Sequence, residues 1–283
     1  MHNMKNTAII TGADGGMGTE ITQAVAQAGY HVIMLCRSAK SGEERKQQII
    51  NNIGPAQMEV MEIDLSSMAI TAKVAQQIQQ KNIKIDLLMN NAGTMSTHFS
   101  QTSEGFEQTV AVNYLAPFLL TNLLLPQMHV GSRIVNMVSC TYAIGKIAPC
   151  FFEKGCQGSF WRIPIYSNTK LALWLFTKEL SKRIEAQGIT VNAADPGVVS
   201  TNIIRMDMWF DPLTDIFFRP FIRTPRQGAD TAIRLLLNEQ FEGISGEMFA
   251  SGKQKHLKSY YHNHPQAISL WNATQERLTK FLR

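Results

Sequence analysis

The sequence has little of what marks membrane and secreted proteins. No stretch of 18 apolar residues occurs, so no membrane-spanning helix is expected. The segment from Met1 to Ile10 runs directly into a strand-like run, without the basic and apolar regions of a signal peptide. These absences favour a cytoplasmic protein.

Cysteine is scarce and unpaired in the sequence. The four cysteines are Cys36, Cys140, Cys150 and Cys156, and none forms a CxxC pair. Cys150 and Cys156 also lack a second ligand pair at the spacing that zinc sites use. We therefore expect reduced thiols, as in cytoplasmic proteins, and no metal site.

Charge of neither sign is concentrated along the chain. Lys and Arg number 27 against 22 Asp and Glu, which gives a net charge of +5, and the excess lies late in the sequence. The basic residues are dispersed, without a basic run or an interleaved aromatic platform, so nucleic-acid binding is not expected. Arg219, Arg223 and Arg226 leave peripheral contact with a membrane surface open, although solvated charge is the simpler interpretation.

What the 283 residues do contain is an alternation of strand-like and helix-like segments. Nearly continuous apolar runs are typical of parallel strands that are covered on both faces. Strands are expected at Thr7–Thr11, His31–Cys36, Met58–Ile63, Ile85–Asn90, Arg133–Val138, Ile189–Ala193 and Glu247–Ala250. Helices are expected at Met17–Ala28, Glu43–Asn51, Met68–Gln80, Phe106–Leu125, Tyr166–Glu185, Pro225–Asn238 and Gln266–Phe281. The alternation predicts one α/β domain over residues 1–283, a doubly wound parallel sheet with helices on both faces.

Two long segments interrupt this alternation, Thr141–Pro164 and Asn202–Thr224. Long loops in compact domains often carry function. We expect the second segment, at about 202–224, to form an apolar lid over the site, with a core segment or a contact between subunits as the alternative. Its apolar residues are Met206, Met208, Trp209, Phe210, Ile216, Phe217 and Phe218. A helical extension at about 255–283 ends the chain.

The strongest local motif is Thr11–Gly18, which follows the first predicted strand and opens the first predicted helix. A tight turn needs residues that tolerate positive φ, and close approach to a pyrophosphate excludes a Cβ. The helix N-terminus also offers free N–H groups and a partial positive charge. The predicted cofactor contacts here are Gly12, Asp14, Gly16, Met17 and Gly18. A glycine cluster also suits an ordinary turn, but its place in a βαβ unit favours a dinucleotide.

The end of the second predicted strand indicates which dinucleotide binds. A carboxylate there would bond the ribose hydroxyls of NAD, whereas an Arg accommodates the 2′-phosphate of NADP. Arg37 stands at this position, with Lys40 nearby, so NADP(H) is predicted and NAD(H) is the less favoured cofactor. Asp14 is an unfavourable neighbour for a phosphate, and a solvated strand end is the alternative interpretation of Arg37.

Several motifs in order resemble the short-chain dehydrogenase/reductase family. They are Thr-Gly-x3-Gly-x-Gly at 11–18, Asn-Asn-Ala-Gly at 90–93, Asn113, Ser139, Tyr166-x3-Lys170 and Asp-Pro-Gly at 195–197. The resemblance covers nearly the whole chain. It implies a Rossmann-type sheet of about seven strands in the order 3-2-1-4-5-6-7, and a homo-oligomer.

Further stretches resemble the retinol-dehydrogenase branch of that family. They are Val112–Thr121, Leu175–Leu180, Pro196–Thr201, Gly243–Gly246 and the long insertion around Gly145-Lys146-Ile147. Members of this branch interconvert lipophilic alcohols and carbonyls, often with NADP(H). Many animal members carry an N-terminal membrane helix that this sequence lacks, and the loops do not match closely enough to transfer retinal as the substrate.

Tyr166 and Lys170 stand four residues apart, which places them on one face of a helix. A nearby ammonium and the positive nicotinamide both favour a phenolate, so we expect Lys170 and the bound cofactor to lower the pKa of Tyr166. The resemblance implies that Tyr166 is the general acid and base and that Lys170 also binds the nicotinamide ribose. It further implies that Ser139 orients the carbonyl oxygen and that Asn113 holds a relay water. Alone, each motif would be an ordinary surface pair or strand-end residue.

The remaining cofactor contacts are also carried over from the matching motifs. Asp64 and Leu65 are expected at the adenine, with Asp64 as the acceptor of the amino group. The residues expected along the adenosine are Asn91, Ala92 and Gly93. Those expected around the nicotinamide are Pro196, Gly197, Val199 and Thr201.

The sequence thus predicts an oxidoreductase that transfers hydride between NADP(H) and a hydrophobic alcohol/carbonyl pair, such as a retinoid, steroid or long-chain aldehyde. A non-catalytic, cofactor-binding regulatory protein on the same fold is the alternative. The intact Ser139, Tyr166 and Lys170 favour the enzyme. A sugar-nucleotide epimerase shares the Tyr-x3-Lys pair, but it needs a larger domain than the roughly 80 residues after Pro196 provide.

Overall fold

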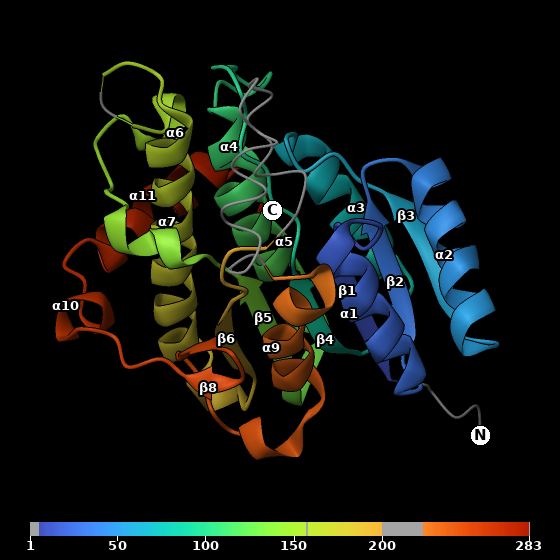
Figure 1. Ribbon diagram of the computed structural model, residues 1–283. Helices are drawn as coiled ribbons and strands as arrows, with labels where there is room; N and C mark the ends of the chain where they lie inside the picture. Colours follow the sequence, from blue (N-terminus) through green and yellow to red (C-terminus); the bar gives the residue numbers. More distant parts are fainter. Residues whose placement is uncertain (1–5, 157, 200–222, 283) are drawn as a thin grey trace.

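The computed structural model describes residues 6–156, 158–199 and 223–282, and these residues are arranged around one central sheet (Figure 1). The strand order is β3-β2-β1-β4-β5-β6-β7-β8. The strands are β1 (Thr7–Thr11), β2 (His31–Cys36), β3 (Met58–Glu62), β4 (Ile85–Asn90), β5 (Met128–Met137), β6 (Thr190–Asp195), β7 (Met248–Ala250) and β8 (Lys253–Gln254). Strands β1 to β7 pair in parallel and β8 is antiparallel to β7. The predicted Rossmann-type order is confirmed, and β8 is an unpredicted addition.

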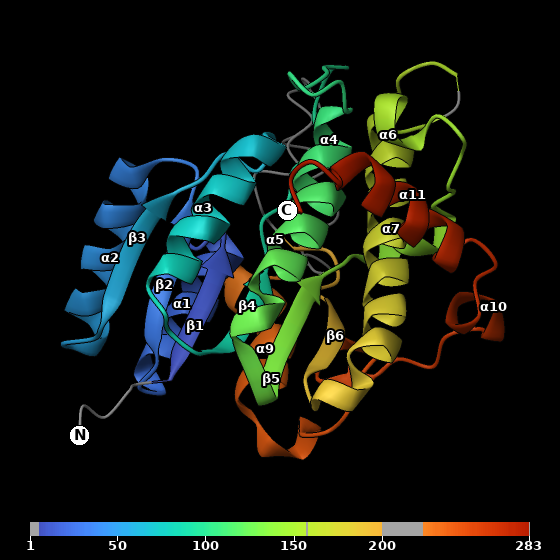
Figure 2. The same cartoon turned by 180° about the vertical axis from the view of Figure 1, so that it is seen from behind.

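Helices cover both faces of the sheet (Figures 1 and 2). On one face lie α1 (Gly16–Gln27), α2 (Ala39–Ile53) and α9 (Pro225–Leu237). On the other lie α3 (Met68–Gln80), α5 (Ala116–Leu124) and α7 (Arg162–Arg183). Helix α11 (Ala267–Leu278) packs outside α5 and α7, and the shorter helices include α4 (Gln108–Val110), the π-helical η1 (Ala111–Leu115), α6 (Phe151–Lys154) and α10 (Ser259–His262). In Figure 2 the arrowheads of β1 and β5 point to the same edge, where the loops before the next helices gather.

The apolar strands divide their side chains between two cores because successive residues point to opposite faces. Ile9 and Ile33 join the cluster under α3, α5 and α7, whereas Ala8 and Ile10 join the cluster under α1 and α9. All four are at most 1% exposed. Double coverage of this kind explains why the strands are almost continuously apolar.

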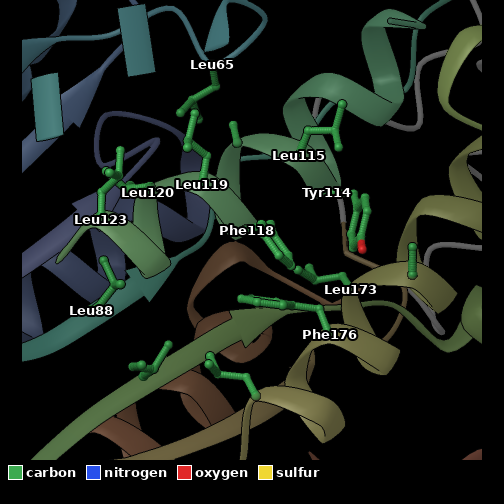
Figure 3. Packing of buried hydrophobic residues seen from close by; sticks show 14 of the residues in the cluster. Leu65, Leu88, Tyr114, Leu115, Phe118, Leu119, Leu120, Leu123, Leu173 and Phe176 are labelled. Carbon is green, nitrogen blue, oxygen red and sulfur yellow. The ribbon is translucent and has the colours of Figure 1, made fainter. Parts of the chain in front are cut away.

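The larger core is closed from outside by α11 (Figure 3 shows its inner part). The Phe118 ring of α5 lies 5.1 Å from that of Phe176 on α7 and 4.8 Å from that of Trp271 on α11. The hydroxyls of Tyr114 and Thr274 add a buried hydrogen bond of 2.7 Å. Each fully buried side chain of this size contributes about 1.5–3 kcal/mol, so α11 is an integral layer over α5 and α7.

Local capping fixes where helices leave the carboxyl edge of the sheet. Ser38 accepts a hydrogen bond from the Ser41 amide at the start of α2, and Ser67 does the same for Ile70 at the start of α3. Helix α9 begins with a complete capping box formed by Thr224, with Pro225 in the first turn. Helix α1 differs, because its N-cap is a glycine without a side-chain cap.

One helical stretch of the described chain, Gln108–Gln127, is long and apolar enough to cross a membrane by composition. It has 78% of its most apolar window buried inside the protein. The burial is supplied by α3 and α7, so this stretch serves as a core helix here.

Candidate active site

A cleft of ≈ 510 Å³ opens at the carboxyl edge of the sheet, where β1 lies between β2 and β4. Chain connections run in opposite directions from this point, which is where open α/β sheets bind ligands. The lining is Gly12, Asp14–Gly18, Leu35, Arg37, Ile63–Ser66, Asn91–Thr94, Gln108 and Val112. All the residues predicted from the first four strand ends therefore come together in this cleft.

The glycine turn is closed so tightly that backbone packs on backbone. Gly12 has a φ of +60°, and a Cβ on Gly18 would lie 1.9 Å from the Gly12 carbonyl oxygen. Gly15 caps α1 without any side-chain hydrogen bond. The start of α1 thus lines the cleft, and the N–H groups of a helix's first turn have no partner within the helix, which suits them to bind phosphate.

Asn91 holds this turn in place. Its side-chain amide donates to the carbonyl oxygens of Thr11, at 3.0 Å, and Gly12, at 3.2 Å. The Thr11 hydroxyl in turn accepts hydrogen bonds from the amides of Asn91 and Ala92, both at 3.0 Å. Thr11 opens the glycine motif, but it was missed as a site residue because its hydroxyl bonds backbone about 80 positions later in the chain.

The adenosine end of the cleft carries exposed polar groups. Arg37 is exposed at the end of β2, and Asp64 is exposed beyond β3 with one carboxylate oxygen bonded to the amide and hydroxyl of Ser66. Asp14 accepts a 2.7 Å hydrogen bond from the Ser41 hydroxyl, which uses part of its acceptor capacity. Burial and the neighbouring Asp14 carboxylate raise the pKa of the Cys36 thiol to about 12, so Cys36 stays protonated.

Tyr166 and Ser139 meet at the other end of the site. Ser139 follows β5 and is 8% exposed, and its hydroxyl shares a hydrogen bond with the phenol of Tyr166 on α7. Burial nevertheless raises the pKa of Tyr166 to about 12, aided by Cys140 and Asp195. The expected lowering of this pKa was therefore wrong for the protein without cofactor, because desolvation of the phenolate outweighs the favourable contacts.

Lys170 lies one turn along α7 with its ammonium 5.4 Å from the centre of the Tyr166 ring. It is 3% exposed and donates to the carbonyl oxygen of Met137 at 2.8 Å. Burial lowers the pKa of Lys170 to about 8, against the opposing charge of Asp195. This ammonium is poised to gain or lose a proton near neutral pH.

Asn113 sits in the π-helical turn η1, a distortion that is frequent at functional sites. Its side chain bonds both backbone groups of Thr94 at 2.8 Å and the Thr169 hydroxyl at 3.1 Å. A Cβ on Gly93 would stand 3.6 Å from the Lys170 ammonium and 3.5 Å from the Asn113 oxygen. Gly93 therefore keeps the cleft open toward both catalytic candidates.

The predicted nicotinamide segment follows β6. Gly197 has a φ of +73° and donates its amide to the Asp195 carboxylate at 3.0 Å, and Val199 packs on Gly228 of α9. Arg223 donates to the Pro196 carbonyl at 3.1 Å and so ties this turn down. The predicted contact Thr201 and residues 202–222 of the predicted lid at about 202–224 lie outside the described residues.

The comparisons with known proteins agree with this geometry. A family model described as short chain dehydrogenase matches residues 6–208. The chain belongs to this family. It is 35% identical over 272 residues to retinol dehydrogenase 12 of Homo sapiens, covering 95% of this chain and 85% of that protein. The resemblance to the retinol-dehydrogenase branch is confirmed, and the short-chain dehydrogenase described here is an oxidoreductase of the CH–OH/C=O type.

Solved structures place the fold in the same family. A crystal structure of an uncharacterised protein from Mycobacterium Paratuberculosis has a TM-score of 0.78 and 25% identity, covering 97% of this chain and 93% of that one. A short chain dehydrogenase from Burkholderia cenocepacia in complex with NADP has a TM-score of 0.68 and 20% identity, with 87% of this chain and 95% of that one covered.

Among the residues that the structure describes, no group of three His, Cys, Asp or Glu side chains could hold a metal ion.

Proposed function

We propose that this short-chain dehydrogenase transfers hydride between NADP(H) and a hydrophobic alcohol/carbonyl pair, with Tyr166, Ser139, Lys170 and Asn113 as its catalytic residues. The observation that carries the proposal is the cluster of half-buried Tyr166 with buried Ser139 and Lys170, whose ammonium would lie 3.6 Å from a Cβ on Gly93 in the lining of the cleft. The open binding cleft and the proposed proton donor therefore adjoin at one edge of the sheet.

The cofactor supplies or removes the hydride when it is bound in the cleft. In reduction, Tyr166 gives its phenolic proton to the substrate oxygen as the carbonyl carbon gains the hydride. A phenol with a pKa of about 12 is fully protonated at neutral pH and is ready to donate. Ser139 donates a hydrogen bond to the same oxygen and disperses the charge that develops there.

Lys170 and Asn113 act after Tyr166 has lost its proton, by stabilising the phenolate and by helping to replace that proton. The Lys170 ammonium stabilises the phenolate, because opposite charges at this separation in a buried site attract strongly. Since its own pKa is about 8, Lys170 can exchange protons with water at neutral pH. Asn113, fixed by three hydrogen bonds in η1, would hold the water that carries this exchange.

The preference for NADP(H) rests on Arg37. Its guanidinium lines the cleft at the end of β2, where it can bond a 2′-phosphate with two donors. The helix α2 begins beside it with its own cap at Ser38, so the first turn presents partial positive charge to the same place. A solved relative in complex with NADP supports the same choice.

Apolar side chains around the catalytic end support a hydrophobic substrate. Trp161, at the start of the helix that carries Tyr166, is 67% exposed, and Ile163 in its first turn is 51% exposed. Phe99 is 44% exposed and packs edge-on against Phe160, at 6.3 Å between ring centres. Val198, beside the nicotinamide turn, is 49% exposed. Exposed apolar groups that gather at a site mark it for apolar ligands.

The test is consumption of NADPH and NADH against a panel of hydrophobic aldehydes and ketones, with wild type and Tyr166→Phe side by side. We expect NADPH to be consumed in preference to NADH, and Tyr166→Phe to lose about 10²–10⁴-fold in rate. Equal turnover by Tyr166→Phe would contradict the mechanism. Tight NADPH binding without turnover on any substrate would favour the regulatory protein instead.

Two further expectations accompany the proposal, a cytoplasmic location and a homo-oligomer. Any contact between copies has to lie outside the faces of α5 and α7 that α11 covers, because those faces are already buried within the chain.

A further inference from the structure

A second charged group lies directly behind the catalytic residues. Asp195 ends β6 and is 2% exposed, and its carboxylate forms an ion pair of 3.0 Å with the Lys255 ammonium. Its other oxygen accepts the Gly197 amide at 3.0 Å. Asp195 therefore connects the nicotinamide turn to a residue that stands some 60 positions later in the chain.

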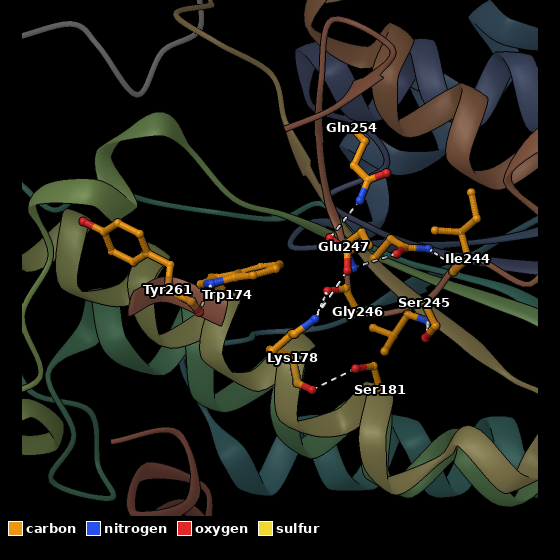
Figure 4. A network of polar contacts seen from close by, with 11 residues as sticks. Trp174, Lys178, Ser181, Ile244, Ser245, Gly246, Glu247, Gln254 and Tyr261 are labelled. Carbon is orange, nitrogen blue, oxygen red and sulfur yellow. Dashed lines mark hydrogen bonds and ion pairs between the residues drawn. The ribbon is translucent and has the colours of Figure 1, made fainter. Parts of the chain in front are cut away.

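Lys255 is held in this position by the short β7–β8 hairpin. Its amide donates to the Met248 carbonyl at 2.7 Å, directly after β8. Figure 4 shows the neighbouring contacts, in which Glu247 accepts hydrogen bonds from Gln254, at 3.1 Å, and from Lys178 of α7, at 3.4 Å. The hairpin is thus fastened to both the sheet and the catalytic helix, and it fixes the backbone from which Lys255 extends.

The Lys255 ammonium also reaches the segment behind Ser139. It lies 5.0 Å from the centre of the Tyr142 ring, and Tyr142 belongs to the turn that begins after Ser139. Burial disfavours this ammonium, but the charge and hydrogen bond of Asp195 outweigh burial and raise the pKa of Lys255. Lys255 therefore remains charged between the loops that follow β5 and β6.

Among the residues that the structure describes, few charges face the catalytic pair. Besides one another, Tyr166 faces Ser139, Cys140 and Asp195, and Lys170 faces Asp195. The Lys170 ammonium donates to the Met137 carbonyl at 2.8 Å, and Met137 pairs with Ala194, the residue before Asp195 on β6. The Asp195 charge raises the pKa of both Tyr166 and Lys170, so an uncompensated carboxylate here would hold both protons more tightly. Asp195 itself faces Lys255, with Tyr142 beside them.

We propose that Lys255 is a positioning residue of this active site, which neutralises Asp195 and fastens the nicotinamide turn to the segment behind Ser139. Through Asp195 it sets the field in which Tyr166 and Lys170 exchange protons. The consequence for turnover rests on the proposed function, whereas the effect on Lys170 can be measured without cofactor or substrate.

The test follows the NMR signal of the Lys170 side chain against pH in isotope-labelled protein without cofactor. The signal is assigned by its absence from Lys170→Arg. Wild type should titrate near pH 8, the pKa that burial gives Lys170. Lys255→Met should move the midpoint to higher pH, because the Asp195 charge then acts unopposed. Lys255→Arg keeps the charge and should restore the wild-type midpoint.

Two further variants separate charge from structure. Lys253→Met, at an exposed position of β8 two residues before Lys255, should leave the titration unchanged. Asp195→Asn combined with Lys255→Met removes both charges and should bring the midpoint back to the wild-type value or below it. In turnover, Lys255→Met should lose about threefold to tenfold at pH 7 in the alcohol-oxidising direction and recover as the pH rises.

A Lys170 midpoint in Lys255→Met that equals wild type, with an intact melting transition, would overturn the proposal. A double variant that shifts as far as Lys255→Met would overturn it too, because the effect would then be structural. Absence of turnover in every variant, together with the expected NMR shifts, would refute the proposed function and leave the role of Lys255 standing.

Discussion

The two halves of the site, along the carboxyl edge of the sheet, differ in the burial and type of the groups that form them. From β1 to β4 the site consists of backbone, glycine and exposed side chains such as Arg37 and Asp64. From β5 to β6 it consists of buried polar side chains, with Ser139, Lys170 and Asp195 at most 8% exposed. The first half is shaped to receive a large charged ligand, and the second is shaped to change the proton affinity of its own groups.

This difference separates the residues expected to bind the cofactor from the residues expected to carry out catalysis. Exposed groups contribute modestly to binding, because water screens their charges. Buried groups experience a low dielectric, which moves the pKa of Tyr166 up to about 12 and that of Lys170 down to about 8. Substitutions in the first half should therefore change affinity, and those in the second should change rate.

The largest expected effect is on the catalytic half. Ser139→Ala removes the hydrogen bond to Tyr166 and the donor to the substrate oxygen, so kcat should fall about 10²–10³-fold with little change in cofactor affinity. Thr141→Ala is the matched control, since its hydroxyl only donates to Ser139 at 3.2 Å. Steady-state kinetics and cofactor titration of Ser139→Ala measure both quantities. A loss of cofactor affinity without a fall in kcat would contradict the division of the site into a binding half and a catalytic half.

Lys170→Met should abolish efficient turnover and stabilise the protein without cofactor. The pKa of Lys170 falls from 10.5 to about 8 on folding, so below pH 8 its burial costs up to about 3 kcal/mol that the variant avoids. Between pH 8 and 10.5 the unfolded chain holds more protons, so wild-type stability rises with pH and the gain shrinks. Denaturant unfolding at pH 7 and pH 10 measures this, with exposed Lys182→Met as control. An equal gain at both pH values would contradict the assignment.

Gly18→Ala should weaken cofactor binding by displacing the glycine turn of the binding half. The new Cβ would lie 1.9 Å from the Gly12 oxygen, so the turn must shift, at about 1–3 kcal/mol of stability, and cofactor affinity should fall at least about tenfold. Gly16→Ala is the control for stability, since its Cβ meets only Pro225 at an ordinary 3.5 Å. Thermal melting and NADPH titration report both effects, and the account fails if the two variants melt alike.

The smallest expected effect is at the exposed end of the cleft. Arg37→Ala should weaken NADPH binding about tenfold and leave NADH binding nearly unchanged, because only the phosphate bond is lost. Lys46 on α2 pairs with Glu43 and does not line the cleft, so Lys46→Ala serves as the control. Equal losses for both cofactors would show that Arg37 does not read the phosphate.

The sequence predicted the parts that depend on local pattern. The apolar strands and the helices between them follow from side-chain periodicity, whereas the strand order came from the family resemblance and is confirmed. Glycines that cannot carry a Cβ, such as Gly18, are also visible in a sequence because only one residue type fits.

What escaped prediction depends on distant contacts and on burial. The hairpin strand β8 has two residues, which is too short for any alternation, so the pairing of Lys255 with Asp195 could not be foreseen. The rise in the pKa of Tyr166 escaped for the same reason, since spacing along a helix reveals Lys170 as a neighbour and not how much water is excluded. The role of Asn91 in holding the glycine turn likewise needs the approach of β4 to β1.

The most direct test of the central claim measures binding and chemistry separately in Tyr166→Phe. NADPH affinity is determined by titration, and the rate of hydride transfer is then followed in a single turnover from the preformed complex. We predict that Tyr166→Phe binds NADPH within about threefold of the wild-type affinity and transfers hydride about 10²–10⁴-fold more slowly. An unchanged transfer rate, or a loss of affinity as large as the loss of rate, would contradict it.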